Sequence, residues 1–138
     1  MPIDLAPVQS LAAAVSAACA EIDAEAERVR LTHITGGAGQ ALAYQAKSAE
    51  ARAILADDQP DPAAYPMVSA RAEVAGITLQ AAAQQIAARA AEWQQLGAAI
   101  EHGREAGKHT VRTAQTHAQV GRSLSAALSG LAALAAAG

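Results

Sequence analysis

The chain has very few large ring-bearing side chains, because it has no phenylalanine, one tryptophan and two tyrosines among 138 residues. Strands favour aromatic and β-branched residues, whereas alanine, which loses no side-chain entropy on folding, is the best helix former. About three residues in ten are alanine. The composition therefore predicts an all-α fold. Because burying an alanine removes little apolar surface from water, the core is expected to be thin, which favours a homo-oligomer.

Other absences exclude several classes of protein. Cys19 is the only cysteine, so no internal disulfide can form, and the first ten residues lack the basic and apolar regions of a secretory signal. We therefore expect synthesis in the cytoplasm. The net charge of −3 argues against general nucleic-acid binding. The uncharged stretch from Leu124 to Gly138 is shorter than the roughly 17 residues of a transmembrane helix, so membrane insertion is not expected.

Large apolar residues recur every seven positions in two parts of the chain, a spacing that places them on one face of a helix. The first stripe lies on a helix expected over about residues 7–31, and the second on a long helix that starts at residue 78. The two stripes are Val8, Val15, Ile22 and Val29, and Leu79, Ile86, Trp93 and Ile100. Two matched stripes on separate helices predict an antiparallel or bundled pairing.

Glycines and prolines divide the chain into its expected parts. Glycines in the run 36–39 predict a turn before a helix over residues 40–56, and the acids and prolines of residues 57–66 predict a linker. A short helix over residues 67–75 should end at Gly76. Glycines 103, 107 and 121 leave helix continuity open beyond that point. We expect an alanine-rich bundle of two to three long helices and a short one over residues 1–117, followed by an apolar helical segment over 118–138.

The apolar C-terminal segment carries its own stripe, which would either close the bundle or bind another chain. Its members are Leu124, Leu128, Leu131 and Ala135. A single tryptophan on a heptad stripe is typical of a core anchor or of an interface hot spot, and in an oligomer the two roles merge. We therefore assign Trp93, Leu124, Leu128 and Leu131 as interface residues.

No catalytic, cofactor-binding or metal-binding residues are predicted. The glycine run lacks a preceding strand and a following Lys-Ser or Lys-Thr pair, so it does not fit a phosphate loop. His102, His109 and His117 include no pair four residues apart, which favours surface histidines over a metal site. Cys19 falls on the first stripe and is expected in the core. If the long helix continues past residue 103, it carries a basic stripe that is either a solvated face or a docking surface. The stripe comprises Arg104, Lys108 and Arg112.

Several stretches resemble segments of tail and tail-fibre-associated proteins encoded by tailed bacteriophages and proteobacterial prophages. They are ITGGAGQ (34–40), YQAKSAEAR (44–52), YP (65–66), AEW (91–93) and AIE (99–101). The similarity covers about residues 11–115 and is a pattern of helices. It implies a non-enzymatic virion component or assembly factor, and it transfers no catalytic or ligand residue.

The leading hypothesis is a non-enzymatic structural protein of the virion tail or tail fibre, acting through helix packing and oligomerisation with copies of itself and other tail proteins. The alternative is a tail or fibre assembly chaperone that is absent from the mature particle. A small helical enzyme would need a convergent polar site, which the sequence does not contain. No cofactor or small-molecule substrate is expected.

Overall fold

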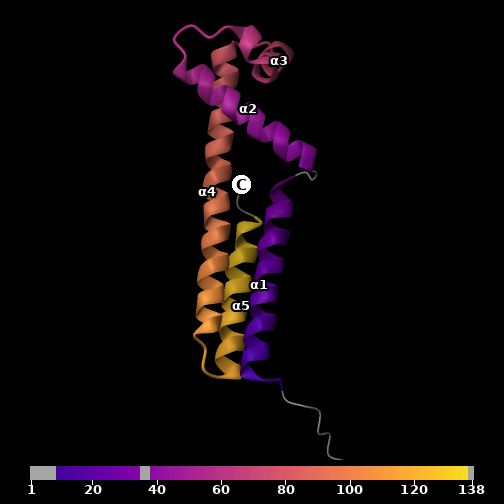
Figure 1. Ribbon diagram of the computed structural model, residues 1–138, viewed down its shortest axis with the longest axis vertical. Helices are drawn as coiled ribbons and strands as arrows, with labels where there is room; N and C mark the ends of the chain where they lie inside the picture. Colours follow the sequence, from indigo (N-terminus) through magenta and orange to yellow (C-terminus); the bar gives the residue numbers. More distant parts are fainter. Residues whose placement is uncertain (1–8, 35–37, 137–138) are drawn as a thin grey trace, which may run out of the picture. The chain divides into compact units, whose positions relative to one another are not determined.

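The computed structural model describes residues 9–34 and 38–136, and this part of the chain consists of helices and short connections, with no strand (Figure 1). The predicted all-α fold is confirmed. The elements are α1 (Leu11–His33), α2 (Ala38–Ala56), the 3-10 helix η1 (Pro62–Ala64), α3 (Pro66–Ala75), α4 (Leu79–Arg112) and α5 (His117–Leu134).

Short polar side chains and one glycine fix where the helices begin and end. The hydroxyls of Ser10, Thr78 and Thr116 accept the N–H of the residue three positions on, at 3.0–3.1 Å. The first helix therefore begins at Leu11, later than the predicted start near residue 7, which lies outside the described residues. Gly76 ends α3 with φ 67°, as predicted. Of the predicted glycine turn, residues 36 and 37 lie outside the described residues, and Gly39 belongs to α2.

The contacts divide the chain into two compact units. Unit 1 comprises residues 1–34 and 96–138, and unit 2 comprises residues 35–95. The helix α4 contributes its first half to unit 2 and its second half to unit 1. This division differs from the boundary predicted between residues 117 and 118, because α5 packs along α1 and therefore belongs to the same unit.

Unit 1 consists of α1, the second half of α4, and α5 (Figure 1). Two histidines show that α1 and α5 run parallel. Near their first residues, His117 Nε2 donates to the carbonyl oxygen of Gln9 at 2.6 Å, and near their last residues His33 Nε2 donates to that of Leu134 at 2.9 Å. The buried core of the unit is Ala18, Cys19, Ile22, Ala26, Val29, Ile100, Val111, Val120 and Leu131. Cys19 thus lies in the core, as predicted.

Two glycines let α4 and α5 approach closely. A Cβ added to Gly107 would lie 2.7 Å from the Cβ of Ala127, and one added to Gly103 would lie 2.9 Å from Cδ2 of Leu131. The helix continues through both positions, which settles the continuity that the sequence left open. Packing against α5 offsets the low helix propensity of glycine there, since only glycine leaves room for the neighbouring side chains.

Unit 2 consists of α2, η1, α3 and the first half of α4. Its buried core is Ala51, Ile54, Val68, Ala72, Ala82 and Ala83. A carboxylate joins α2 to α3, because Glu50 accepts the backbone N–H of Val68 at 2.8 Å at the positive end of α3. The linker predicted over residues 57–66 is ordered by its own acids: Asp61 caps η1, and Asp57 accepts the Tyr65 hydroxyl at 3.1 Å.

The two predicted apolar stripes are largely buried where they are described, but they pair with each other only through Ile100. Ile22 and Val29 are fully buried and Val15 is partly buried, whereas Val8 lies outside the described residues. The stripe on α4 serves two cores, since Leu79 and Ile86 pack in unit 2 and Ile100 in unit 1. None of the helices in the described ranges is long and apolar enough to span a membrane.

Candidate functional site

The leucines predicted to form an interface lie in the core of unit 1. Leu131 is 1% exposed, and Leu124 and Leu128 are partly buried against the same cluster. The C-terminal segment therefore closes the bundle of its own chain, the first of the two possibilities that the sequence left open. A contact with another subunit through these three side chains would require α5 to leave α1 and α4.

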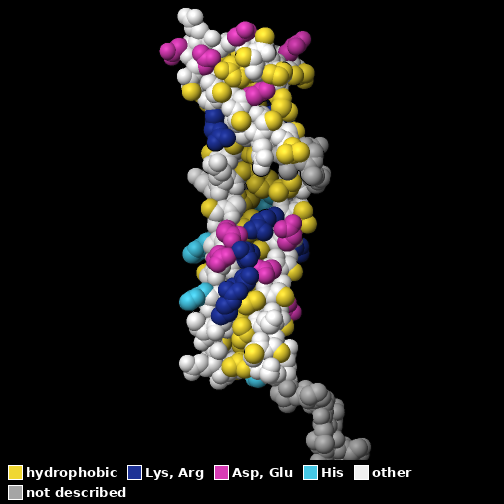
Figure 2. Space-filling model, in the orientation of Figure 1, with side chains coloured by type: hydrophobic (Ala, Val, Ile, Leu, Met, Phe, Trp, Pro, Cys, Tyr) yellow, Lys and Arg dark blue, Asp and Glu magenta, His cyan; other side chains and the backbone are white. Residues whose placement is uncertain are grey.

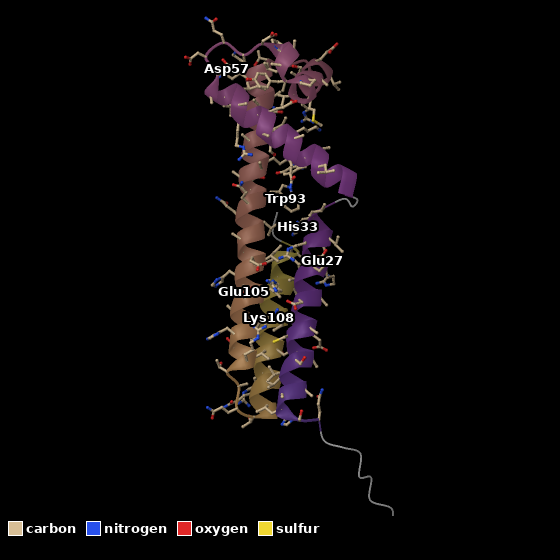
Figure 3. All side chains as sticks on the ribbon, in the orientation of Figure 1. Glu27, His33, Asp57, Trp93, Glu105 and Lys108 are labelled. Atoms are coloured by element: carbon tan, nitrogen blue, oxygen red, sulfur yellow. The ribbon has the colours of Figure 1, made fainter. Side chains whose placement is uncertain are left out.

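Trp93, the other predicted interface residue, lies in unit 2 and is half-buried. Its side chain projects from α4 and meets Tyr44 of α2 edge to face, with ring centroids 6.4 Å apart and planes at 68° (Figure 3). This geometry is one that aromatic quadrupoles favour. The tryptophan thus helps to hold α2 on α4.

A pocket lies beside this aromatic pair, between α2 and the first half of α4, with a volume of about 580 Å³. All of its lining residues belong to unit 2: Tyr44, Gln45, Ser48, Arg52, Ala87, Ala90, Ala91, Trp93 and Gln94. Two hydroxyl oxygens in its lining, Tyr44 Oη and Ser48 Oγ, are buried without a hydrogen-bond partner in the described structure. Arg52 is the only charged residue of the lining.

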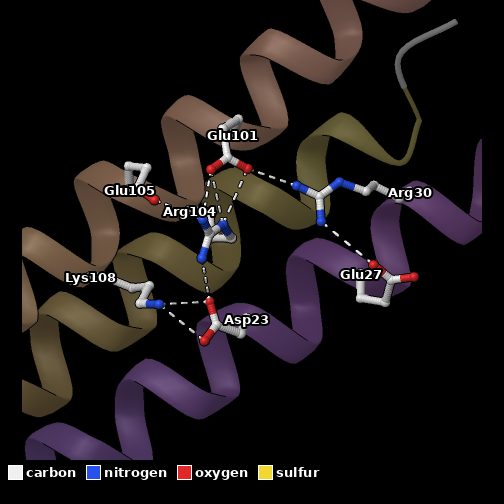
Figure 4. Close-up of polar contacts among 7 residues, drawn as sticks. All are labelled: Asp23, Glu27, Arg30, Glu101, Arg104, Glu105 and Lys108. Atoms are coloured by element: carbon white, nitrogen blue, oxygen red, sulfur yellow. Dashed lines mark hydrogen bonds and ion pairs between the residues drawn. The ribbon is translucent and has the colours of Figure 1, made fainter.

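A second polar cluster joins α1 to α4 within unit 1 (Figure 4). At its centre, the guanidinium of Arg104 lies 2.9 Å from Asp23 Oδ1 and 2.7 Å from Glu101 Oε1. Lys108 Nζ also donates to Asp23, at 3.0 Å. Arg30 on α1 extends the cluster by binding Glu101 Oε2 at 2.8 Å. Ion pairs between α1 and α4 thus join these two helices.

This network decides the role of most of the basic stripe predicted on α4. Arg104 and Lys108 are neutralised by Asp23, an acid on another helix, while Arg112 is exposed. Figure 2 shows the same interspersion of basic and acidic side chains at the surface. These pairs could not be predicted from the sequence, because the partners lie 81 and 85 residues apart. The network is a helix clamp in place of the basic docking surface considered from the sequence.

The cations lower the pKa values of the acids in the network. Hydrogen bonds from Arg104 and Lys108 hold the pKa of Asp23 below its ordinary value of 3.8. A hydrogen bond from Arg104 likewise lowers the pKa of Glu101 from 4.5. Both side chains are 46% exposed, so solvent screens the pairs and their contribution to stability is small.

We expect the stability of unit 1 to fall in acid through this network. A carboxylate whose pKa is lowered by folding stabilises the folded chain above its unfolded pKa, and the effect is lost as the pH falls through the folded value. For Asp23 the loss therefore begins near pH 3.8 and continues below it. Urea unfolding between about pH 5 and 3 should show a smaller loss for Asp23→Asn than for the unsubstituted chain.

Asp58→Asn serves as the matched control for this measurement. Asp58 is exposed in the connection after α2 and forms no ion pair with any residue that the structure describes. Its replacement should leave the acid-induced loss unchanged. Equal pH profiles for Asp23→Asn and the unsubstituted chain would show that the α1–α4 pairs contribute nothing measurable.

The remaining candidates do not converge on a site. Over residues 9–34 and 38–136, no three His, Cys, Asp or Glu side chains are placed to hold a metal ion. His102 and His109 are exposed, and His117 binds the carbonyl of Gln9. Polar side chains from more than one helix come together in the α1–α4 network and in the pocket beside Trp93.

Comparison with known proteins identifies no relative: no family model, no curated protein and no solved structure matches the chain. The likeness to phage tail segments thus rests on the short stretches quoted above. Inferences about function rest on those stretches and on the geometry of the two units.

Proposed function

We propose that the chain is a non-enzymatic structural protein of a phage or prophage tail or tail fibre, which works by packing helices against other protein chains. The observation that carries this proposal is the distribution of large apolar side chains in unit 2. Only Ile54 and Val68 are large and fully buried there, whereas Leu42, Leu55 and Val74 are 66%, 40% and 89% exposed. Three further aliphatic side chains, Ile77, Leu79 and Ile86, are only partly buried against this core.

The exposure of Leu42, Leu55 and Val74 favours association with another chain. The other four buried residues of the unit 2 core are alanines, so the unit gains little from burial within its own chain. Hydrophobic side chains are visible at the surface around α3 (Figure 2). Complete burial of a fully exposed aliphatic side chain contributes roughly 1.5–3 kcal/mol, a value that Val74, at 89% exposed, approaches most closely of the three. A second copy of the chain, or another tail protein, is the proposed source of that burial.

The assignment to a phage tail is supported by the resemblance of the stretches at 34–40, 44–52, 65–66, 91–93 and 99–101. The non-enzymatic part is supported by the use of charge: the seven charged side chains in Figure 4 form ion pairs with one another, and three of these pairs join α1 to α4. In this proposal unit 1 is a clamped helical scaffold, and unit 2 presents the surface that binds partners.

The mass of the purified protein in solution, measured by light scattering after size exclusion, tests self-association. We expect a mass above that of one 13.9 kDa chain, and a decrease toward one chain in Val74→Asp, because a charge at an interface resists desolvation. Ala70→Asp is the control, since it adds the same charge to an exposed position of α3 without removing a large apolar side chain. A single-chain mass at every concentration would contradict self-association.

Mass spectrometry of purified phage particles tests the tail assignment. A structural protein is present in the particle in a fixed ratio to other tail proteins. If the chain is made during particle production and absent from finished particles, it acts as an assembly chaperone instead. If particle yield and composition are the same in cells that lack the chain, neither tail role holds.

A further inference from the structure

The pocket of unit 2 combines an unpaired cation, aromatic edges and unsatisfied hydroxyls in one place. We propose that this pocket binds an organic carboxylate carried on an aromatic ring, either as a free small acid or as the C-terminus of a peptide. The proposal goes beyond the packing role above, since it assigns a binding site to residues between α2 and α4. Its elements are independent of the exposed side chains that carry the proposed function.

The charge of the pocket selects an anion. Arg52 is its only charged residue, and it forms no ion pair or hydrogen bond with the residues that the structure describes. This contrasts with Arg28, Arg30 and Arg104, which all pair with carboxylates. A guanidinium presents parallel N–H donors that match the two oxygens of a carboxylate. The side chain at the rim is therefore left to bind an anion from outside the chain.

The apolar residues of the lining indicate which uncharged group the ligand carries. The rings of Tyr44 and Trp93 meet edge to face at one side of the pocket, where the labelled Trp93 of Figure 3 projects from α4. Three alanines of α4 also line it and leave the space that larger side chains would fill: Ala87, Ala90 and Ala91. A volume of about 580 Å³ lies within the range of small-molecule sites. The aromatic and alanine side chains offer apolar contacts to an aromatic ring.

The two hydroxyls are the second, independent sign of a missing partner. Ser48 is only 8% exposed, and its Oγ has no hydrogen-bond partner in the described structure; the same is true of the buried Tyr44 Oη. Leaving a buried hydroxyl unsatisfied costs free energy, so such groups are normally bonded. Because the Ser48 Oγ has no accessible surface, it can donate to a carboxylate oxygen in the pocket only after its side-chain torsion changes.

Trp93 provides a direct measurement, because it is the only tryptophan of the chain and lines the pocket. We expect benzoate to change its fluorescence saturably, and benzyl alcohol, which has the ring without the charge, to bind about twofold to fivefold more weakly, because Arg52 is exposed. Acetate at the same concentration controls for ionic strength. N-acetylphenylalanine tests the peptide source: binding of this compound alone assigns a peptide C-terminus, and binding of benzoate alone assigns a free small acid.

Arg52→Gln should remove the preference for benzoate over benzyl alcohol. Arg71→Gln is the matched control, because Arg71 is exposed on α3 and does not line the pocket. Circular dichroism of both variants checks that the helices are retained, and the comparison of the two ligands on the unsubstituted chain needs no variant. Three results would overturn the proposal. They are equal affinities for benzoate and benzyl alcohol, no saturable fluorescence change with any of the carboxylates, and the same ligand preference in the two arginine variants.

Discussion

We expect Leu131→Ala to lower the free energy of unfolding by about 2–5 kcal/mol, the range for removing a buried leucine side chain. Leu131 is 1% exposed and lies over Gly103, where α4 has no side chain that could fill the space. The change therefore leaves a cavity between α4 and α5 in addition to losing buried surface. Urea unfolding followed by circular dichroism measures the effect.

The same substitution at an exposed position of the same unit is the control. Leu31 on α1 is 57% exposed, so Leu31→Ala should change the free energy of unfolding by no more than about 0.5 kcal/mol. The experiment also decides how the C-terminal helix packs. A Leu131→Ala chain of unchanged stability whose mass falls to that of one chain would mean that α5 packs against another subunit, contrary to the structure.

Two glycines of α4 should respond in opposite directions to alanine. Gly107→Ala should lower the free energy of unfolding by about 1–2 kcal/mol, because overpacking outweighs the gain in helix propensity. The new Cβ would lie 2.7 Å from the Cβ of Ala127, which has no rotamer to change, so the helices must separate. Gly97→Ala should raise the free energy of unfolding by about 0.5–1 kcal/mol, since nothing lies within 4 Å of the added Cβ.

The difference between these two variants isolates the helix contact, because both change the same residue type in the same helix. The free energies of unfolding of the two variants, measured side by side with urea, should therefore differ by about 1.5–3 kcal/mol. If both variants are stabilised to a similar degree, α4 and α5 do not approach each other as closely as the glycines indicate.

Much of the fold could be predicted from local sequence signals. Thr78 and Gly76 bound their helices through contacts that span three to five positions, and the stripe through Ile22 and Val29 follows from helical periodicity alone. Continuity at Gly107 was not predictable, because the low helix propensity of glycine is local while the compensation comes from Ala127 on another helix. The side on which the last helix packs depends in the same way on distant residues.

The candidate sites were less predictable than the helices. Asp23 and Lys108 lie 85 positions apart, and charge patterns within one helix carry no information about such a partner. Trp93 was identified from the heptad stripe. The pocket beside Trp93 was not predictable, because it also depends on Tyr44, whose ring contacts Trp93 only when α2 packs against α4. The available signal was the spacing of Tyr44, Ser48 and Arg52, each one helical turn apart, which places all three on one face of α2.

The parallel pairing of α1 with α5 sets an order for folding during synthesis. Residues 35–95 form a contiguous unit, so unit 2 can fold once this stretch has left the ribosome. The first helix must wait, because the residues that cover Ile22 and Val29 include Val120 and Leu131, which are translated about a hundred codons later. Throughout that interval its apolar face is open to solvent and to chaperones, and completion of unit 1 coincides with the emergence of α5.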